Sequence, residues 1–151
     1  MVMSRHLWIW IQNLLCVVVL ILGPAKAGFG GHLEGVFRWG VPVLGGALIL
    51  RGAWLGSAGV RDLGSSRTPH PQPLEGGQLV THGVYAHVRH PLYSGLVHVA
   101  FGWAVVWGSL AAMVASVGLT VWLIAKARLE ERLMRERYQG YAEYQRQVRE
   151  F

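Results

Sequence analysis

Four long apolar runs, separated by more polar segments, set the pattern of the chain. They cover Leu7–Gly23, Val36–Gly59, Leu92–Trp107 and Leu110–Ala125. A helix needs about 20 apolar residues to cross the hydrocarbon core of a bilayer, and the last two runs fall slightly short of that length. They would gain the missing length by continuing past the lipid boundary. The pattern therefore predicts an all-α integral membrane bundle with about four transmembrane helices and a cytoplasmic helical tail.

The connection between the last two runs is the dipeptide Gly108–Ser109. It leaves room only for a tight turn, so the third and fourth runs should form an antiparallel hairpin. A helical pattern continues beyond the fourth run as far as Gly140, a residue type that commonly ends helices. Tyr141, Tyr144 and Val148 then recur with helical spacing, which predicts a short amphipathic helix against the bundle or the membrane surface.

We expect the whole chain to form one domain. Two N-terminal membrane helices would occupy residues 1–60, a cytoplasmic loop residues 61–91, and the hairpin with its tail residues 92–151. Pro69, Pro71 and Pro73 alternate in the loop, which disfavours a helix there and predicts an extended path. The glycines of the loop lack the G-x-G-x-x-G spacing, so a Rossmann-type nucleotide site is not supported.

Basic residues are concentrated on one side of the predicted bundle. The chain has 14 Lys and Arg against 8 Asp and Glu, which gives a formal charge of +6. The other side holds Lys26 clearly and Arg38 near a boundary. By the positive-inside rule, both termini should therefore face the cytoplasm. The charge then favours contact with anionic lipid headgroups, and no nucleic-acid partner is expected because the chain offers no basic soluble surface.

The beginning of the chain has a second interpretation. Arg5, the apolar stretch 14–22 and Ala25-Lys26-Ala27 together resemble a signal peptide with its cleavage site. Cleavage there would leave the rest of the topology unchanged. The abundance of Arg over Lys indicates a GC-rich, bacterial coding sequence, and hence a bacterial cytoplasmic membrane. The single Cys16 can form no internal disulfide.

The motif GVYAHVRHPLYSG, residues 83–95, stands at the start of the third run. Pro91 suits the first turn of a helix, where its missing N–H costs nothing. Arg89 and His90 precede it, and they could be simple anchors at the membrane interface. A helix N-terminus, however, presents free N–H groups and the positive end of the helix dipole. With Arg89 beside it, this position should bind a carboxylate or a phosphate.

Two adjacent acids, Glu130 and Glu131, follow the fourth run. A solvated helix face is the usual place for such a pair. Ionisable groups close to the bilayer are nevertheless functional candidates, and a glutamate near Arg89 could bind a cationic group of a ligand. S-adenosylmethionine carries a carboxylate, an ammonium and a sulfonium, so it would match both charged positions.

The motif at 83–95, the paired glutamates and the Y-x-x-Y of Tyr141 and Tyr144 together resemble the isoprenylcysteine carboxyl methyltransferase family. The related phospholipid N-methyltransferases share this C-terminal arrangement. The resemblance extends from about Leu63 to Phe151. It implies an integral membrane methyltransferase that binds S-adenosylmethionine between its last two membrane helices and receives a lipophilic acceptor from the bilayer.

Carried over by position, the resemblance implies a set of cofactor-binding residues. They are Tyr85, Arg89, His90, Tyr93, Gly95, Glu130 and Glu131. Arg89 and His90 would bind the methionyl carboxylate, and Glu130 or Glu131 would bind the ammonium. Arg89, His90 and Glu131 are the residues that we expect to be catalytic, and no metal is expected.

The remaining residues of the motif have roles in shaping the cofactor site. Tyr85 and Tyr93 would pack against the adenosine or the sulfonium, and Gly95 would let the cofactor approach the backbone. His98 and Gly102 share a helix face with Gly95 and could extend this wall. Small residues in membrane helices more often serve close helix packing.

The acceptor is left open by the sequence. Family members that act on prenylated proteins have a longer C-terminal end with a basic residue for the acceptor carboxylate, whereas this chain ends QRQVREF. A prenylcysteine substrate therefore does not follow, and the acceptor could be a carboxylate, a thiol or an amine. Arg51, Arg146 and Arg149 are candidates to bind an acidic group of the acceptor.

Three other functions are compatible with parts of the pattern. A membrane reductase with a nicotinamide cofactor shares this general architecture, and a non-catalytic membrane adaptor would need no cofactor. A metal or haem site could draw on the seven histidines. No two of them have a convincing ligand spacing, since His87 and His90 are three residues apart in a segment expected to be irregular.

Overall fold

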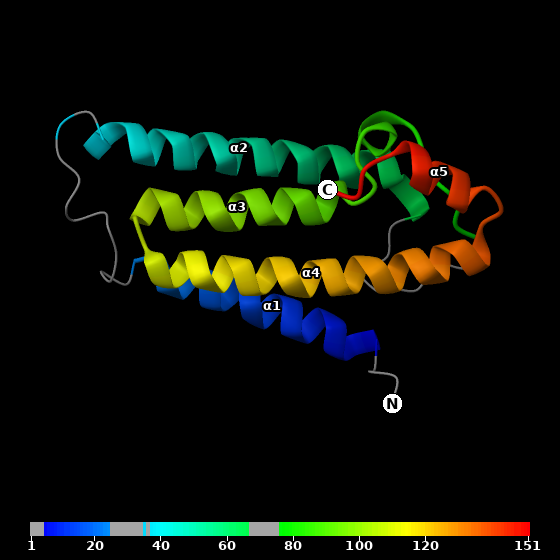
Figure 1. Ribbon diagram of the computed structural model, residues 1–151, viewed down its shortest axis with the longest axis horizontal. Helices are drawn as coiled ribbons and strands as arrows, with labels where there is room; N and C mark the ends of the chain where they lie inside the picture. Colours follow the sequence, from blue (N-terminus) through cyan, green and yellow to red (C-terminus); the bar gives the residue numbers. More distant parts are fainter. Residues whose placement is uncertain (1–4, 25–34, 36, 67–75) are drawn as a thin grey trace.

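The computed structural model describes residues 5–24, 35, 37–66 and 76–151, and this part of the chain is helical (Figure 1). Its helices are α1 (Arg5–Leu22), α2 (Phe37–Leu63), η2 (Gly64–Ser66), η3 (Gly83–Ala86), α3 (Pro91–Trp107), α4 (Leu110–Arg137) and α5 (Tyr141–Gln147). No strand occurs within these described segments. The predicted all-α bundle is therefore confirmed.

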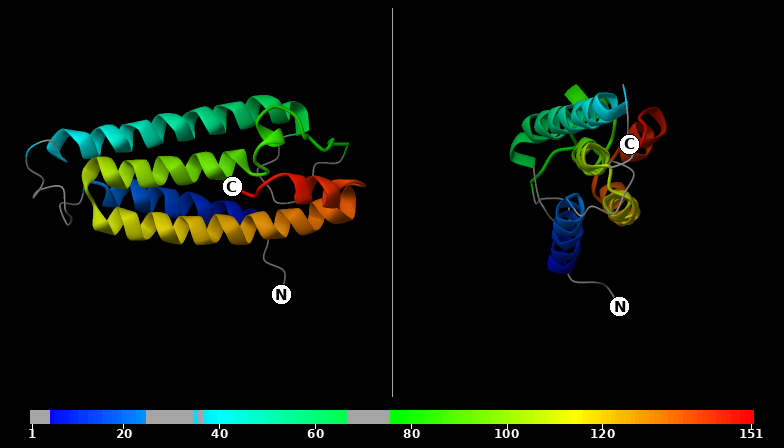
Figure 2. Two further views of the ribbon diagram at one scale, coloured as in Figure 1. Left: turned by 45° about the horizontal axis from the view of Figure 1, so that its top comes forward. Right: turned by 90° about the vertical axis from the view of Figure 1, so that its left-hand side faces the viewer.

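The long helices lie side by side with their axes roughly aligned. α3 lies between α2 and α4, and α1 runs along α4 on the side remote from α2 (Figures 1 and 2). Each of the four predicted runs corresponds to one long helix. α2 ends at Leu63, four residues later than its apolar run, because the helix continues from Val60 to Leu63 into the more polar segment. α4 continues to Arg137, as the sequence predicted.

The turn between α3 and α4 forms the predicted hairpin. Gly108 has the left-handed conformation, with φ of 58°, which a glycine adopts without steric cost. Ser109 caps the start of α4, since its Oγ accepts a hydrogen bond from the Ala112 amide at 3.1 Å. The same hydroxyl donates to the Leu22 carbonyl at 2.7 Å and so ties the end of α1 to the hairpin.

A seam of glycines joins α2 to α3. A Cβ placed on Gly52 would lie 2.5 Å from the Gly95 carbonyl oxygen, and one on Gly102 would lie 2.7 Å from the Gly45 carbonyl oxygen. Each helix therefore contributes two glycines separated by two turns, and the backbones approach closely. Gly95 and Gly102 serve this helix packing, the commoner of the two roles considered for such small residues.

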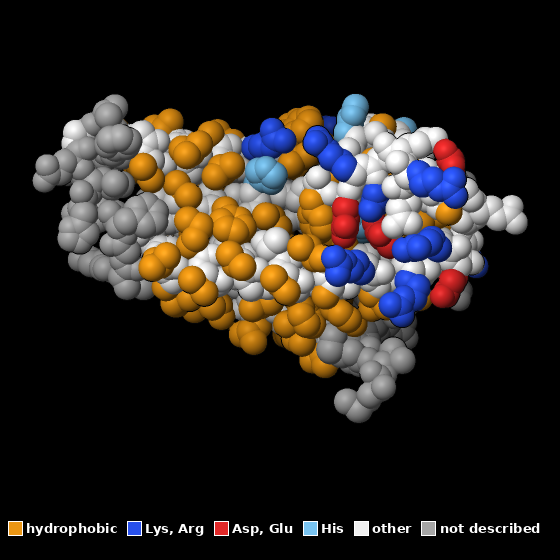
Figure 3. Space-filling view, viewed as in Figure 1, with side chains coloured by type: hydrophobic (Ala, Val, Ile, Leu, Met, Phe, Trp, Pro, Cys, Tyr) orange, Lys and Arg blue, Asp and Glu red, His pale blue; other side chains and the backbone are white. Residues whose placement is uncertain are grey.

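Large apolar side chains cover the outside of the bundle. Trp39 and Leu50 of α2 are each 73% exposed, and Val114 and Val121 of α4 are more than half exposed. Trp39–Ser66 and Leu110–Arg137 are long and apolar enough to cross a membrane, and His6–Leu22 and Pro91–Trp107 are shorter apolar helices. On the face shown in Figure 3, charged side chains gather toward one end of the bundle, and hydrophobic side chains cover much of the rest. An apolar exterior of this extent is suited to lipid.

The two ends of the described chain lie toward the same end of the bundle (Figure 1). This arrangement agrees with a four-helix topology, and the cytoplasmic location of that end stays a prediction. The side chain of Arg5 and the residues Lys26, Arg67 and Ala25–Ala27 lie outside the described residues, as do the three alternating prolines. The predicted tail helix is α5, whose Tyr141 and Tyr144 are buried against the bundle.

Candidate active site

The segment that leads into α3 is held against α2. Gly83 has φ of 59°, and a Cβ on it would lie 2.1 Å from Asp62 Oδ2. That carboxylate accepts a hydrogen bond from the Val84 amide at 2.8 Å, which fixes the start of η3. The side chains of Val84, Tyr85 and Val88 then form an apolar cluster with Leu55 and Ala58 of α2. This packing sets the direction in which Arg89 and His90 leave the backbone.

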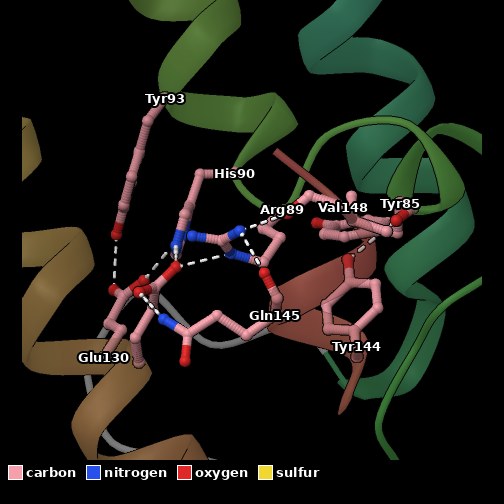
Figure 4. Close-up of polar contacts among 9 residues, drawn as sticks. Tyr85, Arg89, His90, Tyr93, Glu130, Tyr144, Gln145 and Val148 are labelled. Atoms are coloured by element: carbon pink, nitrogen blue, oxygen red, sulfur yellow. Dashed lines mark hydrogen bonds and ion pairs between the residues drawn. The ribbon is translucent and has the colours of Figure 1, made fainter. Parts of the chain in front are cut away.

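Arg89 lies at the centre of a buried polar network (Figure 4). Its Nε donates to Glu131 Oε1 at 2.7 Å, and the two side chains are only 8% and 5% exposed. One terminal nitrogen donates to the carbonyl oxygens of Gln145, at 3.1 Å, and Val148. Among the described residues, the other terminal nitrogen has no hydrogen-bond partner. The prediction that Arg89 and Glu131 meet across the hairpin is confirmed.

Glu131 is satisfied almost entirely by protein groups. Besides Arg89, it accepts a hydrogen bond from Gln145 Nε2 at 2.7 Å and lies 3.2 Å from His90 Nε2. Helical spacing also allows Glu131 to pair with Arg135, but the carboxylate turns toward Arg89 instead. Backbone hydrogen bonds also join the start of α3 to the last residues of the chain, since the amides of Arg89 and His90 donate to the carbonyls of residues 149 and 150 at 2.9 and 3.2 Å.

Glu130 faces a different set of partners. Tyr93 donates its hydroxyl to Glu130 Oε1 at 2.5 Å, and His90 Nδ1 lies 3.7 Å from Oε2 (Figure 4). The rings of His90 and Tyr93 are stacked, with centroids 5.5 Å apart and planes 4° from parallel. His90 therefore lies between the two glutamates, with one ring nitrogen toward each.

Tyrosines of the C-terminal tail close the charged end of the site. Tyr144 donates its hydroxyl to the Tyr85 carbonyl at 2.7 Å, and its ring meets that of Tyr141 edge to face. Burial raises the pKa of Tyr144 to about 12, and it also raises the pKa values of Tyr85 and Tyr141. These phenols therefore stay protonated at neutral pH, so Tyr144 can act as a donor throughout the physiological range.

A cavity of about 780 Å³ begins at this network and extends between the helices. Its volume lies within the range of small-molecule sites. Six of the seven predicted cofactor-binding residues line it, namely Tyr85, Arg89, His90, Tyr93, Gly95 and Glu130. Glu131 lies instead at a second depression, which it shares with Arg89, Arg128, Arg132 and Gln145 among others. The adjacent glutamates thus face two different spaces.

The cavity wall also contains a residue to which the sequence gave no role in the site. Lys126 lies on α4 one turn before Glu130 and is 3% exposed. Its Nζ donates to Gln12 Oε1 of α1 at 2.9 Å and lies 5.2 Å from the centre of the Tyr93 ring. From the sequence, Lys126 is only one of the basic residues that follow the apolar runs. The signal that could have identified it is its i,i+4 spacing to Glu130 directly after an apolar run.

The arginines proposed for the acceptor do not line the cavity. Arg51 is exposed on α2, where its Nε donates to His98 Nε2 at 3.2 Å, and His98 in turn donates through Nδ1 to the Ser94 carbonyl. Arg146 pairs with Glu143 on the outside of α5. Within the described residues, no three His, Cys, Asp or Glu side chains are grouped so as to hold a metal ion.

Comparison with known families gives one match. The sequence model of the phospholipid methyltransferase family matches residues 41–140. Among curated proteins no match was found. The matched segment covers most of α2 and all of α3 and α4, and so includes Arg89, His90, Tyr93 and both glutamates. Together with the apolar exterior of the bundle, this match shows that the chain belongs to the phospholipid methyltransferase family, which is related to the isoprenylcysteine carboxyl methyltransferases, and is a membrane methyltransferase.

Proposed function

We propose that the protein uses S-adenosylmethionine to methylate a lipophilic acceptor that enters the cavity from the bilayer. The observation that carries this proposal is the cavity itself, which joins a charged end to an apolar interior. Arg89, His90 and Glu130 line the charged end. Gly52, Leu96 and Val99 belong to the apolar wall, and helices α1 to α4 all contribute.

The charged end fits the three charged groups of S-adenosylmethionine. Among the described residues that line the cavity, Glu130 is the acidic one, so it is suited to the ammonium or the sulfonium. Arg89 retains one terminal nitrogen for a carboxylate, and His90 lies beside it. Tyr85 and Tyr93 offer aromatic faces to the adenosine or the sulfonium, since a cation is attracted to a ring face.

Glu131 acts in this proposal as a positioning residue. Its carboxylate holds the Nε of Arg89, approaches His90 and accepts from Gln145, so it fixes the side chains that would contact the cofactor. Its contribution to catalysis would therefore be indirect. Arg89 and His90 are the expected contacts to the methionyl carboxylate.

Methyl transfer requires mainly that the protein place the acceptor atom correctly against the methyl donor. S-adenosylmethionine supplies a methyl group already activated on a sulfonium. The residues of the site need only hold the acceptor atom in line with the sulfur–carbon bond and keep water away. An amine acceptor would also lose a proton, and His90, which lines the charged end of the cavity, is a base that would take it.

We further propose that the charged end of the bundle faces the cytoplasm of a bacterium. Arg61, Arg89, Arg128 and the basic residues of the tail belong to this end. The positive-inside rule then orients it toward the cytoplasm. S-adenosylmethionine is made and used in that compartment, so the charged end of the cavity would open toward its supply.

Transfer of a labelled methyl group to a lipid extract tests the proposal. Purified protein in nanodiscs would be incubated with S-adenosylmethionine labelled on the methyl group and with extracted lipids. We expect label in the organic phase with the wild-type protein and with Arg132→Ala, whose side chain is exposed, and a loss of label with Glu130→Gln. No incorporation combined with binding of a nicotinamide cofactor would favour a reductase instead, and binding of neither would favour an adaptor.

A further inference from the structure

The cavity wall contains a second charged group, the ammonium of Lys126 on α4, which is hydrogen-bonded to Gln12 of α1. Nζ of Lys126 lies 2.9 Å from Gln12 Oε1, and both side chains line the cavity. A lysine that is 3% exposed in the midst of apolar helices is expensive to keep charged. Such residues in membrane helices commonly serve a ligand pathway, and this one borders the space that the acceptor would enter.

The lysine lies deeper in the bundle than the glutamate that faces the same cavity. Lys126 precedes Glu130 by one helical turn, which is about 6 Å along the helix axis. α4 runs from the apolar end of the bundle to the charged end, so Lys126 lies on the apolar side of Glu130. Along the cavity, an acidic position at the cofactor end is thus followed by a basic position and then by the apolar wall.

We propose that Lys126 and Gln12 bind an anionic oxygen group of the lipophilic acceptor, an inference that rests on the proposed methyl transfer. The Lys126 ammonium is the charged donor. Gln12 Oε1 accepts from Lys126, so the amide nitrogen of Gln12 keeps its two N–H groups as donors for an anion bound beside Lys126. The apolar part of the acceptor then lies along Gly52, Leu96 and Val99. Its nucleophile is held toward the end of the cavity that contains Glu130.

Two acceptors share this chemistry. In a long-chain carboxylic acid, the anion is itself the nucleophile. A carboxylate lone pair forms the oxygen–methyl bond while the sulfur–methyl bond breaks, its electron pair goes to sulfur, and no proton is released. In an aminophospholipid, the anion is the phosphodiester and the amine attacks, so a proton leaves the nitrogen for His90. A simple long-chain amine has no anion for Lys126 and would be repelled by it.

Binding of three labelled probes tests the proposal. Palmitate, phosphatidylethanolamine and hexadecylamine would be titrated against the purified full chain in neutral detergent. The variants are Lys126→Met, which removes the charge at similar length, Lys126→Arg, which keeps it, and Gln12→Leu. Affinity for S-adenosylmethionine, measured by calorimetry on the same preparations, shows that each variant is folded and separates this inference from the proposed function.

We expect wild-type protein to bind palmitate or phosphatidylethanolamine, and whichever of the two binds identifies the source of the anion. Lys126→Met should weaken that binding by about 10- to 100-fold and Gln12→Leu by about 3- to 10-fold, as for loss of a charged and a neutral partner. Lys126→Arg should retain most of it, and hexadecylamine binding should not weaken. Affinity for S-adenosylmethionine should change less than affinity for the anionic probe, although Lys126 Nζ lies 5.2 Å from the centre of the Tyr93 ring at the cofactor end.

Two results would overturn the inference. One is wild-type protein that binds neither anionic probe. The other is a Lys126→Met variant that binds the probes as the wild type does. If wild-type protein fails to bind S-adenosylmethionine, while Lys126→Met loses the anionic probe but binds hexadecylamine no less tightly than the wild type, the proposed methyl transfer fails and the anion site stands.

Discussion

Glu130 and Glu131 are neighbours on α4, yet their carboxylates lie in two regions that are built differently. The region around Glu131 is closed by protein groups, with Arg89, Gln145 and His90 all in contact with its carboxylate. The region around Glu130 opens into the cavity, and the Glu130 carboxylate accepts a short hydrogen bond from the hydroxyl of Tyr93. One region is completed by the chain itself, whereas the other leaves space for a ligand.

The difference indicates how the two acids should respond to substitution. A buried charge that is fully paired within the protein contributes mainly to the fold, because its removal leaves the partner charge buried and unpaired. A charge that borders a cavity contributes mainly to ligand binding. Substitutions on the two sides of α4 should therefore separate stability from affinity.

Glu131→Gln is expected to have the largest effect on stability. It leaves the Arg89 guanidinium, which is 8% exposed, without its carboxylate. Loss of one partner from a buried ion pair typically costs about 3 to 5 kcal/mol of unfolding free energy. Unfolding by SDS, followed through the intrinsic fluorescence of the seven tryptophans, measures the change. A variant as stable as the wild type would show that the network around Arg89 does not hold the tail to α3.

Tyr144→Phe should have an intermediate effect. It removes the hydroxyl that donates to the Tyr85 carbonyl at 2.7 Å, while the buried ring is kept. Loss of one such hydrogen bond should cost about 1 kcal/mol. The same SDS titration gives the value, and Tyr138→Phe is a matched control, since its hydroxyl donates to the carbonyl of Gly77 at 3.0 Å, away from the α3 start. Equal losses in both variants would argue against a special role of the tail contact.

Arg132→Ala should have the smallest effect. Its side chain is exposed at the second depression, next to Glu131 in sequence but outside the network of hydrogen bonds around Arg89. Removal of an exposed charge usually changes stability by less than about 1 kcal/mol. The midpoint of unfolding and the affinity for S-adenosylmethionine should both match the wild type. A large change in either would mean that the second depression contributes to the site.

The sequence predicted those features that depend on local patterns. Apolar runs predicted the four long helices, Gly108 and Ser109 predicted the hairpin, and tyrosine spacing predicted the tail helix. The contact between Arg89 and Glu131 could also be predicted, because an antiparallel hairpin brings the chain back to the end of the bundle where α3 begins. In each case, the information lies within a few turns of one helix or one connection.

Other features depend on contacts between distant parts of the chain, and local patterns do not report them. Helical spacing could not show which glutamate faces the cavity, since the answer depends on where the tail carbonyls of residues 145 and 148 lie. It also could not show that Lys126 of α4 meets Gln12 of α1, 114 residues earlier. Gly95 was expected beside a cofactor, and the close approach of α2 gives it a packing role as well.

Calorimetric titration of S-adenosylmethionine into wild-type protein and Glu130→Gln tests the central claim most directly. The glutamine keeps an oxygen to accept the Tyr93 hydroxyl, so the variant should fold, but it removes the negative charge that lines the cavity. We expect the wild type to bind and the variant to bind about 10- to 100-fold more weakly, as for loss of one partly desolvated charged contact. Equal affinities in the two proteins would contradict the assignment of Glu130 to the cofactor.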